Sequence, residues 1–114
     1  MAQTKFMFVY HIPCQGEAPQ PSPAEMQAML AQWEAWKQKF KNQVVELGDG
    51  LKLGGRVLTN GVITDGPYVE SKDIVGGYSI ISAASYDEAL SVARECPMVF
   101  VPGASIEIRE LAGY

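Results

Sequence analysis

The sequence predicts a two-layer α+β domain, in which two helices cover one face of an antiparallel sheet. Three observations predict it: short apolar stretches typical of strands, two capped segments with helical periodicity, and an Asn-Gly pair typical of a hairpin. The chain has 114 residues, of which 47% are hydrophobic and 19% are charged. These values suit a single domain spanning residues 1–114.

The first strand and the first helix are predicted in the first half of the chain. KFMFVYHI, residues 5–12, is rich in aromatic and β-branched residues, and both faces of this strand are apolar. Ser22 and Glu25 form a capping box around Pro23, which predicts the start of a helix. Its apolar stripe consists of Met26, Leu30, Trp33, Phe40, Val44 and Leu47. Gly48 is the expected end of this helix.

A β-hairpin is predicted at Asn60-Gly61, because both residues of this two-residue turn accept a positive φ. Its register places Arg56 opposite Asp65, so that the two charges pair across the strands. Gly66-Pro67 then fixes the backbone and displays Asp65 beside the sheet face. We therefore expect a rigid turn at this position.

Two strands and a helix are predicted in the second half. GGYSIIS, residues 76–82, predicts a strand, and residues 85–96 predict a helix that has its own capping box and ends at Pro97. The last strand, residues 104–111, alternates in polarity. Its two faces carry, respectively, Ile106 with Ile108 and Glu107 with Arg109.

The predicted order is strand, long helix, hairpin, strand, short helix and strand, which corresponds to a ferredoxin-like two-layer domain. Its two helices cover one face of the sheet, and the other face needs a cover that the chain does not contain. We expect a second copy to supply it, in a face-to-face homodimer whose sheets enclose a shared cavity.

Composition and motifs exclude several functions. A formal net charge of -4 provides no basic surface, so we expect no direct nucleic-acid partner and no membrane partner. No leader and no run of roughly 20 apolar residues is evident, which predicts a cytoplasmic protein. Cys14 and Cys96 are expected at opposite ends of the fold, too far apart for a disulfide. Two cysteines and one histidine cannot build a closed zinc site, and the glycine pairs lack nucleotide-binding spacing, so we expect no metal and no cofactor.

DGPYVESKD, residues 65–73, resembles the signature Asp-Gly-Pro-Phe-x-Glu-x-Lys-Glu of the DGPF branch of the YCII-related domain family. Tyr68 replaces the Phe of this signature, and Asp73 replaces its final Glu. The likeness continues through GGYSII, SYDEALSVARECP and IEIREL, so that it covers residues 56–111 well.

This resemblance implies a dimeric α/β barrel of ferredoxin-like subunits. It implies less about function, because most members have no assigned activity. A few are lyase-type enzymes acting on small aromatic compounds, and DGPF members often accompany alternative sigma factors, which implies a transcription-related protein partner. Smaller members carry a histidine early in the first helix, where this sequence has none.

Asp65 and His11 are the candidate catalytic residues. With Arg56 opposite, Asp65 stays ionised and can orient a substrate or accept a proton weakly, or else it caps backbone N–H groups in its turn. His11 is the only histidine and shares a strand face with Met7 and Val9. It is either a general acid or base, or a strand-end histidine bonded to backbone or water.

The candidate binding residues are Arg56, Tyr68, Lys72, Glu107 and Arg109. If the isoleucines of the last strand meet the helices, Glu107 and Arg109 point into the dimer cavity, where Arg109 can hold a carboxylate or phenolate. These two charges can instead pair with each other or across the dimer. Tyr68 and Lys72 either line the mouth of the cavity or are simply exposed.

Of three functions, we favour a non-catalytic module that binds a small molecule in the dimer cavity and has a regulatory role linked to sigma-factor transcription. The alternative is a lyase-type enzyme for a small aromatic or carboxylate substrate, in which Asp65 and His11 transfer protons and Arg109 holds the substrate. The third is a structural or accessory dimer. A single histidine leaves few groups for proton transfer, which favours the first function over the second.

Overall fold

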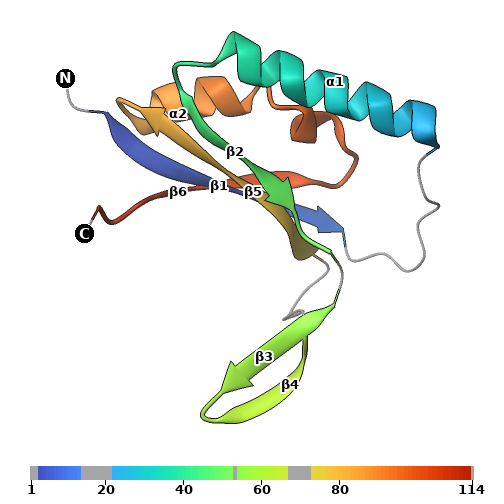
Figure 1. Cartoon of the computed structure of the whole chain (residues 1–114). Helices are drawn as coiled ribbons and strands as arrows, with labels where there is room; N and C mark the ends of the chain where they lie inside the picture. The colour runs from blue at the N-terminus through green and yellow to red at the C-terminus, as the bar shows by residue number, and fades with distance from the viewer. Residues whose placement is uncertain (1–2, 14–21, 53, 67–72, 114) are drawn as a thin grey trace.

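The computed structural model describes residues 3–13, 22–52, 54–66 and 73–113. Its elements in chain order are β1 (Thr4–Pro13), α1 (Pro23–Lys39), β2 (Val44–Gly50), β3 (Gly55–Thr59), β4 (Val62–Gly66), β5 (Asp73–Ala83), α2 (Tyr86–Ala93), the 3-10 turn η1 (Pro97–Phe100) and β6 (Ser105–Glu110). Four strands form an antiparallel sheet in the order β2-β5-β1-β6, and β3 pairs with β4 in a separate two-stranded sheet (Figure 1). The predicted α+β class is confirmed.

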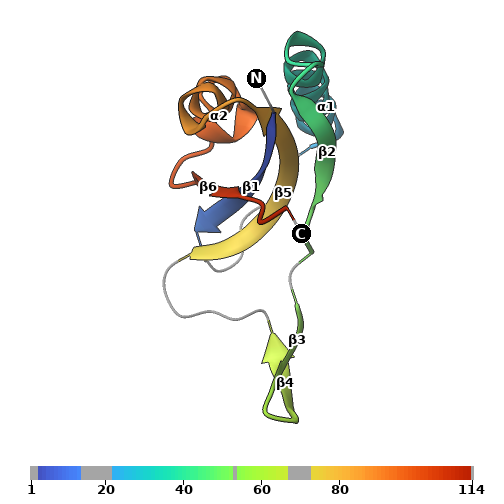
Figure 2. The ribbon, with the colours of Figure 1, turned by 90° about the vertical axis from the view of Figure 1, so that its left-hand side faces the viewer.

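Both helices cover the same face of the four-stranded sheet, as Figure 2 shows. Phe6, Phe8 and Tyr10 of β1 are buried on this face, in one core cluster with Trp36 of α1 and Val92 of α2. The indole Nε1 of Trp36 also donates a hydrogen bond to the carbonyl oxygen of Val92, at 3.0 Å. The two helices are therefore joined to each other as well as to the sheet.

A chain of buried polar groups crosses the core beneath the helices. The Tyr10 hydroxyl donates to Ser79 Oγ at 2.7 Å, and Ser79 Oγ donates to the Leu47 carbonyl oxygen at 2.5 Å. The Cys96 thiol lies 3.7 Å from the Tyr10 hydroxyl. Burial raises the pKa of both Tyr10 and Cys96, so both groups stay neutral at physiological pH. This chain links three adjacent strands, β1, β5 and β2.

Helix α1 begins as predicted but ends earlier. Ser22 and Glu25 form the predicted capping box, whereas the helix stops at Lys39 and Phe40 already has non-helical angles, φ -112 and ψ 37. The prediction that the helix continues to Leu47 is wrong, because Val44 to Gly50 form strand β2. Two adjacent β-branched residues at the start of β2 favour this extended backbone, in which Val44 pairs with Ile81.

Gly48 does not end a helix but lies inside β2, at a local irregularity in its pairing with β5. The register shifts between Glu46 and Asp49, and Gly48 has φ +79. A Cβ atom at this position would lie 1.8 Å from the carbonyl oxygen of Tyr78. Only glycine therefore allows the two strands to approach this closely.

The hairpin has the predicted register. Leu58 pairs with Ile63 and Arg56 with Asp65, around a turn in which Asn60 has φ 51 and Gly61 has φ 79. The hairpin nevertheless projects away from the four-stranded sheet (Figure 1). The expectation that Asp65 is displayed beside the sheet face is therefore wrong, because β3 and β4 are not strands of that sheet.

The second half follows the prediction with small differences at the ends of elements. Helix α2 starts after Ser85, whose side chain accepts a hydrogen bond from the Glu88 backbone N–H, and it ends at Ala93 rather than at Cys96. The turn η1 begins at Pro97 and was not predicted. Cys14 lies outside the described residues, so the expectation of two distant cysteines remains a prediction.

Replacing Gly48 with alanine should destabilise the protein far more than the same change at Gly61. Both residues have φ +79, so both variants carry a similar backbone strain, but a Cβ at Gly61 meets no atom within 4 Å. Only Gly48→Ala must push β2 away from β5, which we expect to cost at least about 2 kcal/mol more. Urea denaturation of both variants measures the difference, and equal losses of stability would contradict the close approach of the two strands.

Candidate functional site on the open sheet face

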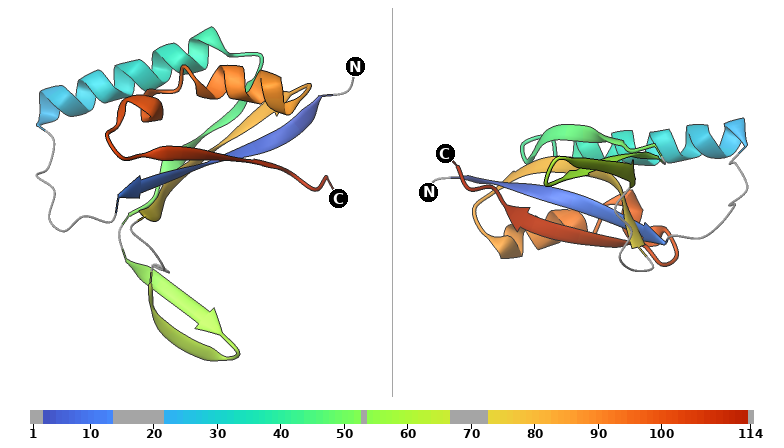
Figure 3. Two further views of the ribbon diagram at one scale, coloured as in Figure 1. Left: turned by 180° about the vertical axis from the view of Figure 1, so that it is seen from behind. Right: turned by 90° about the horizontal axis from the view of Figure 1, so that it is seen from below.

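The face of the four-stranded sheet opposite the helices is covered by no element within the described ranges (Figure 3, right). Strand pairing places Met7 opposite Ile80 and Arg109, and Val9 opposite Tyr78 and Glu107. Residues paired in this way point to the same side of a sheet. We call this surface the open face and define it as Met7, Val9, His11, Tyr78, Ile80, Glu107 and Arg109.

The centre of the open face is apolar and its β6 side is charged. Met7, Val9 and Ile80 are half-buried and form the centre, whereas Glu107 and Arg109 are exposed. Ile106 and Ile108 pack against the core on the opposite face, as the alternation of the last strand predicts. A hydrogen bond also connects β6 to α2, because the Glu110 backbone N–H donates to the Tyr86 hydroxyl at 3.2 Å.

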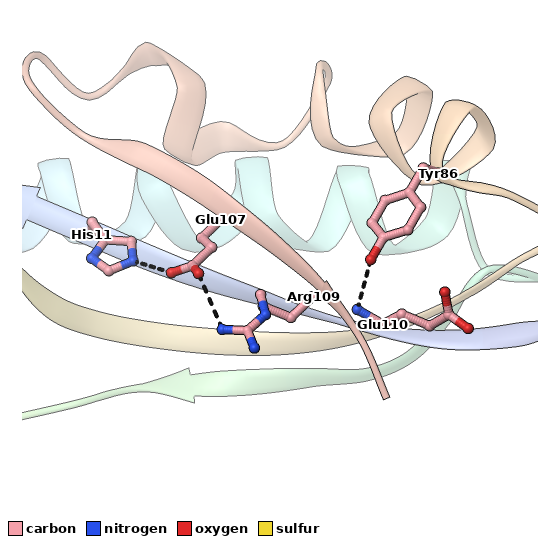
Figure 4. Close-up of polar contacts among 5 residues, drawn as sticks. All are labelled: His11, Tyr86, Glu107, Arg109 and Glu110. Carbon is pink, nitrogen blue, oxygen red and sulfur yellow. Dashed lines mark hydrogen bonds and ion pairs between the residues drawn. The ribbon is translucent and has the colours of Figure 1, made fainter. Parts of the chain in front are cut away.

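Three charged or titratable side chains meet on this face, as Figure 4 shows. His11 Nε2 lies 2.8 Å from Glu107 Oε1, and Arg109 Nη1 lies 3.4 Å from Glu107 Oε2. His11 pairs with Ser105 in the ladder, so Glu107 is its diagonal neighbour on the adjacent strand. The His11 side chain is 26% exposed, whereas that of Arg109 is 71% exposed.

Glu107 is held in its ionised form by its two neighbours. The hydrogen bond from His11 is the larger cause that lowers the pKa of Glu107, and the hydrogen bond from Arg109 lowers it further. An ionised carboxylate only accepts hydrogen bonds, so His11 Nε2 must carry the hydrogen and donate it. This leaves the other ring nitrogen, Nδ1, to accept or release a proton.

This arrangement supports two kinds of chemistry. A carboxylate that orients an imidazole is a common device for positioning a general base. The exposed guanidinium of Arg109 presents further N–H donors, which suit a carboxylate or phenolate in a bidentate contact. Because these groups border an apolar surface, the face matches an organic anion that also has an apolar body.

Tyr78 adds a phenol to the same face. Its hydroxyl donates to Glu46 Oε1 at 3.3 Å, and the charge of Glu46 is the main cause that raises the pKa of Tyr78. Sequence reasoning missed this pair because it placed Glu46 on a helix. The β-branched pair Val44 and Val45 was the signal for a strand there.

The structure does not unite all predicted site residues. Arg56 and Asp65 lie 3.6 Å apart on the hairpin, with side chains 70% and 93% exposed, and no described hydrogen bond or ion pair joins Asp65 to His11. Tyr68 and Lys72 lie outside the described residues. Glu107 and Arg109 do contact each other, which was the alternative to an anion clamp. The functional roles of these seven residues remain predictions.

In the described part of the chain, no three His, Cys, Asp or Glu residues gather in a group that could hold a metal ion. No described helix is both long and apolar enough to cross a membrane. The open face is therefore the site that the polar contacts indicate.

Comparison with known proteins identifies a relative and a family. An uncharacterized protein of Rhizobium meliloti (strain 1021) is 40% identical over 53 residues, which are 46% of this chain. The match spans 43% of the length of that relative, less than half. The family model of the YCII-related domain matches residues 6–112. This range contains all described helices and strands, apart from Thr4 and Lys5 at the start of β1. This chain therefore belongs to the YCII-related domain family.

Proposed function

We propose that this domain forms a homodimer through its open face and binds a small organic anion in the space between the two sheets. The observation that carries the proposal is the position of Arg109, beside the His11–Glu107 contact and at the border of a half-buried apolar surface. A binding site of this kind needs few polar groups if these converge on an apolar surface.

The homodimer is supported by the apolar centre of the open face. Met7, Val9 and Ile80 keep part of their surface in contact with solvent on a sheet whose other face is already covered. Antiparallel sheets that face water normally carry polar residues on that side. In a dimer with two-fold symmetry, the commonest symmetry of protein dimers, the same residues of both copies would be buried against each other.

The anionic ligand is supported by the balance of charges around Arg109. Glu107 is shared between His11 and Arg109, and the contact to Arg109 is the longer of the two. Arg109 therefore retains free donors for a second carboxylate or for a phenolate.

We further assign the chain to the DGPF branch and give it a regulatory role linked to sigma-factor transcription. This assignment is supported by the resemblance of residues 65–73 to the DGPF signature. In such a role the domain would bind its ligand without converting it, and a transcription-related protein would recognise the loaded dimer.

A lyase-type enzyme is the alternative, and the His11–Glu107 contact favours it, because it positions an imidazole for proton transfer. Asp65 was expected to share this task. Within one chain it lies instead on the projecting hairpin, paired with Arg56. Of the two residues expected to transfer protons, only His11 therefore lies on the open face of a single chain.

Val9→Glu should convert the dimer into a monomer, because it places a charge at the apolar centre of the open face. Phe100→Glu is the matched control, since Phe100 is exposed on η1, on the helix side of the sheet. We expect native mass spectrometry to detect dimers of the wild type and of Phe100→Glu, and monomers of Val9→Glu. A monomeric wild type would refute the dimer.

Salicylate, which carries both a carboxylate and a phenol, is a suitable probe of the anion site. We expect Arg109→Gln to weaken its binding at least about tenfold, because a charge-assisted contact is lost. Arg94→Gln removes an exposed charge at the end of α2 and should leave binding unchanged. Isothermal titration calorimetry measures all three proteins. Equal affinity of the wild type and Arg109→Gln would contradict the role of Arg109, and consumption of the salicylate would favour the alternative enzyme.

His11→Ala should raise the pKa of Glu107 more than Arg109→Gln does, because the hydrogen bond from His11 is the larger cause of the lowered pKa. Since the folded protein lowers this pKa, the contacts are fully formed above the pKa of an unfolded glutamate. They are lost as the pH falls through the lowered value. A carbon-13 NMR titration of the Glu107 carboxyl group measures the shift. An unchanged pKa in His11→Ala would contradict the contact.

A further inference from the structure

The hairpin of β3 and β4 lies on the same side of the four-stranded sheet as the open face. In Figures 1 and 2, both helices lie above the sheet and the hairpin lies below it. The hairpin follows the end of β2 at Gly50 and precedes the start of β5 at Asp73, so it leaves the sheet at the end where β1 carries His11. A copy that packs against the open face must therefore lie beside this hairpin.

Two glycines allow the chain to turn out of the sheet at the base of the hairpin. Gly54 has φ +93 and Gly55 has φ +143, both in the region that favours glycine. A Cβ at either residue would meet no atom within 4 Å, so the backbone conformation, rather than close packing, requires glycine here. Strand β3 consequently starts in a new direction and does not join the four-stranded sheet.

Both faces of the hairpin carry exposed apolar side chains. Leu58 and Ile63 pair across the strands on one face and are 68% and 67% exposed. Val62 pairs with Thr59 on the other face and is also exposed. Within the described ranges, β3 and β4 pair only with each other. A two-stranded hairpin is at best marginally stable alone in water, so these side chains favour packing against another surface.

The hairpin carries no net charge that would oppose such a contact. Arg56 and Asp65 are the charged residues between positions 54 and 66, and they form an ion pair at 3.6 Å near the base of the hairpin. Leu58 and Ile63 lie between this ion pair and the turn at Asn60-Gly61. The part nearest the turn is therefore uncharged and largely apolar.

The length of the hairpin matches the spacing of packed sheets. Each of its strands has five residues, which span about 17 Å. Two sheets packed face to face lie about 10 Å apart. The hairpin is therefore long enough to cross the gap between two sheets and to reach the edge of the second.

We propose that the hairpin is an arm that holds a second copy of this chain, with Leu58 and Ile63 packed against the edge of the partner's sheet. This pair is chosen because it is the larger exposed apolar surface of the hairpin. The inference rests on the homodimer proposed above and adds a contact outside the open face. Two-fold symmetry gives two such arms, one from each copy.

Leu58→Glu places a charge in this contact and should weaken the dimer at least about tenfold. Leu30→Glu is the matched control, because Leu30 is 64% exposed on α1, on the opposite side of the sheet. Sedimentation velocity over a range of protein concentrations measures the dissociation constants of the wild type and both variants. Equal constants of the wild type and Leu58→Glu would refute the arm and leave the homodimer standing, whereas a monomeric wild type would refute both.

Hydrogen exchange of the wild type tests the same contact without a substitution. Below the dissociation constant of the dimer, β3 and β4 have no partner copy, so their amide hydrogens should exchange at least about tenfold faster than above it. The amide hydrogens of α1 are the internal control and should change little, because α1 lies on the opposite side of the sheet. Exchange of the hairpin at the same rate in monomer and dimer would overturn the arm.

Discussion

The alternation of side chains along β1 constrains both layers of the molecule. Phe6, Phe8 and Tyr10 enter the core beneath the helices, whereas Met7 and Val9 point to the open face. A shift of the strand by one residue would exchange the two sets, exposing the aromatic rings. The hydrogen bond from Tyr10 to Ser79 opposes such a shift, because it forms in one alignment of β1 with β5. The same strand carries His11, so core packing and the candidate site depend on one register.

Opposite faces of the sheet differ in charge as well as in their covering. His11, Glu107 and Arg109 lie on the open face, whereas the face beneath the helices buries the neutral groups of Tyr10, Ser79 and Cys96. The net charge of -4 hides this difference, because it sums over the whole surface.

Local signals in the sequence predicted where elements begin. Where α1 ends and which residues form β2 depend instead on pairing between distant parts of the chain. The capping box at Ser22 and the Asn60-Gly61 turn were recognised because each signal lies within a few residues. The end of α1 was misjudged because Val44 and Leu47 keep helical spacing and pack against the same core, although they belong to a strand. Spacing alone cannot distinguish these two arrangements.

The candidate site was likewise predictable within one strand but not between strands. The sequence placed Glu107 and Arg109 on the face opposite Ile106 and Ile108, and the structure agrees. It could not pair His11 with Glu107, because that contact requires β1 and β6 to be neighbours. The exposure of Met26, Met29 and Leu30 in the first half of α1 could not be predicted, because helical spacing does not show how far the sheet extends beneath the helix.

The projecting hairpin can unfold separately from the four-stranded sheet and its helices. Its strands pair with each other and not with the four-stranded sheet, and a two-stranded hairpin alone is at best marginally stable in water. It can therefore open at a small free energy while the core stays closed, and its amide hydrogens would exchange long before those of β1. Insertions or substitutions around Asn60-Gly61 would leave the core almost untouched. Evolution can thus alter the length and sequence of this segment independently of the fold.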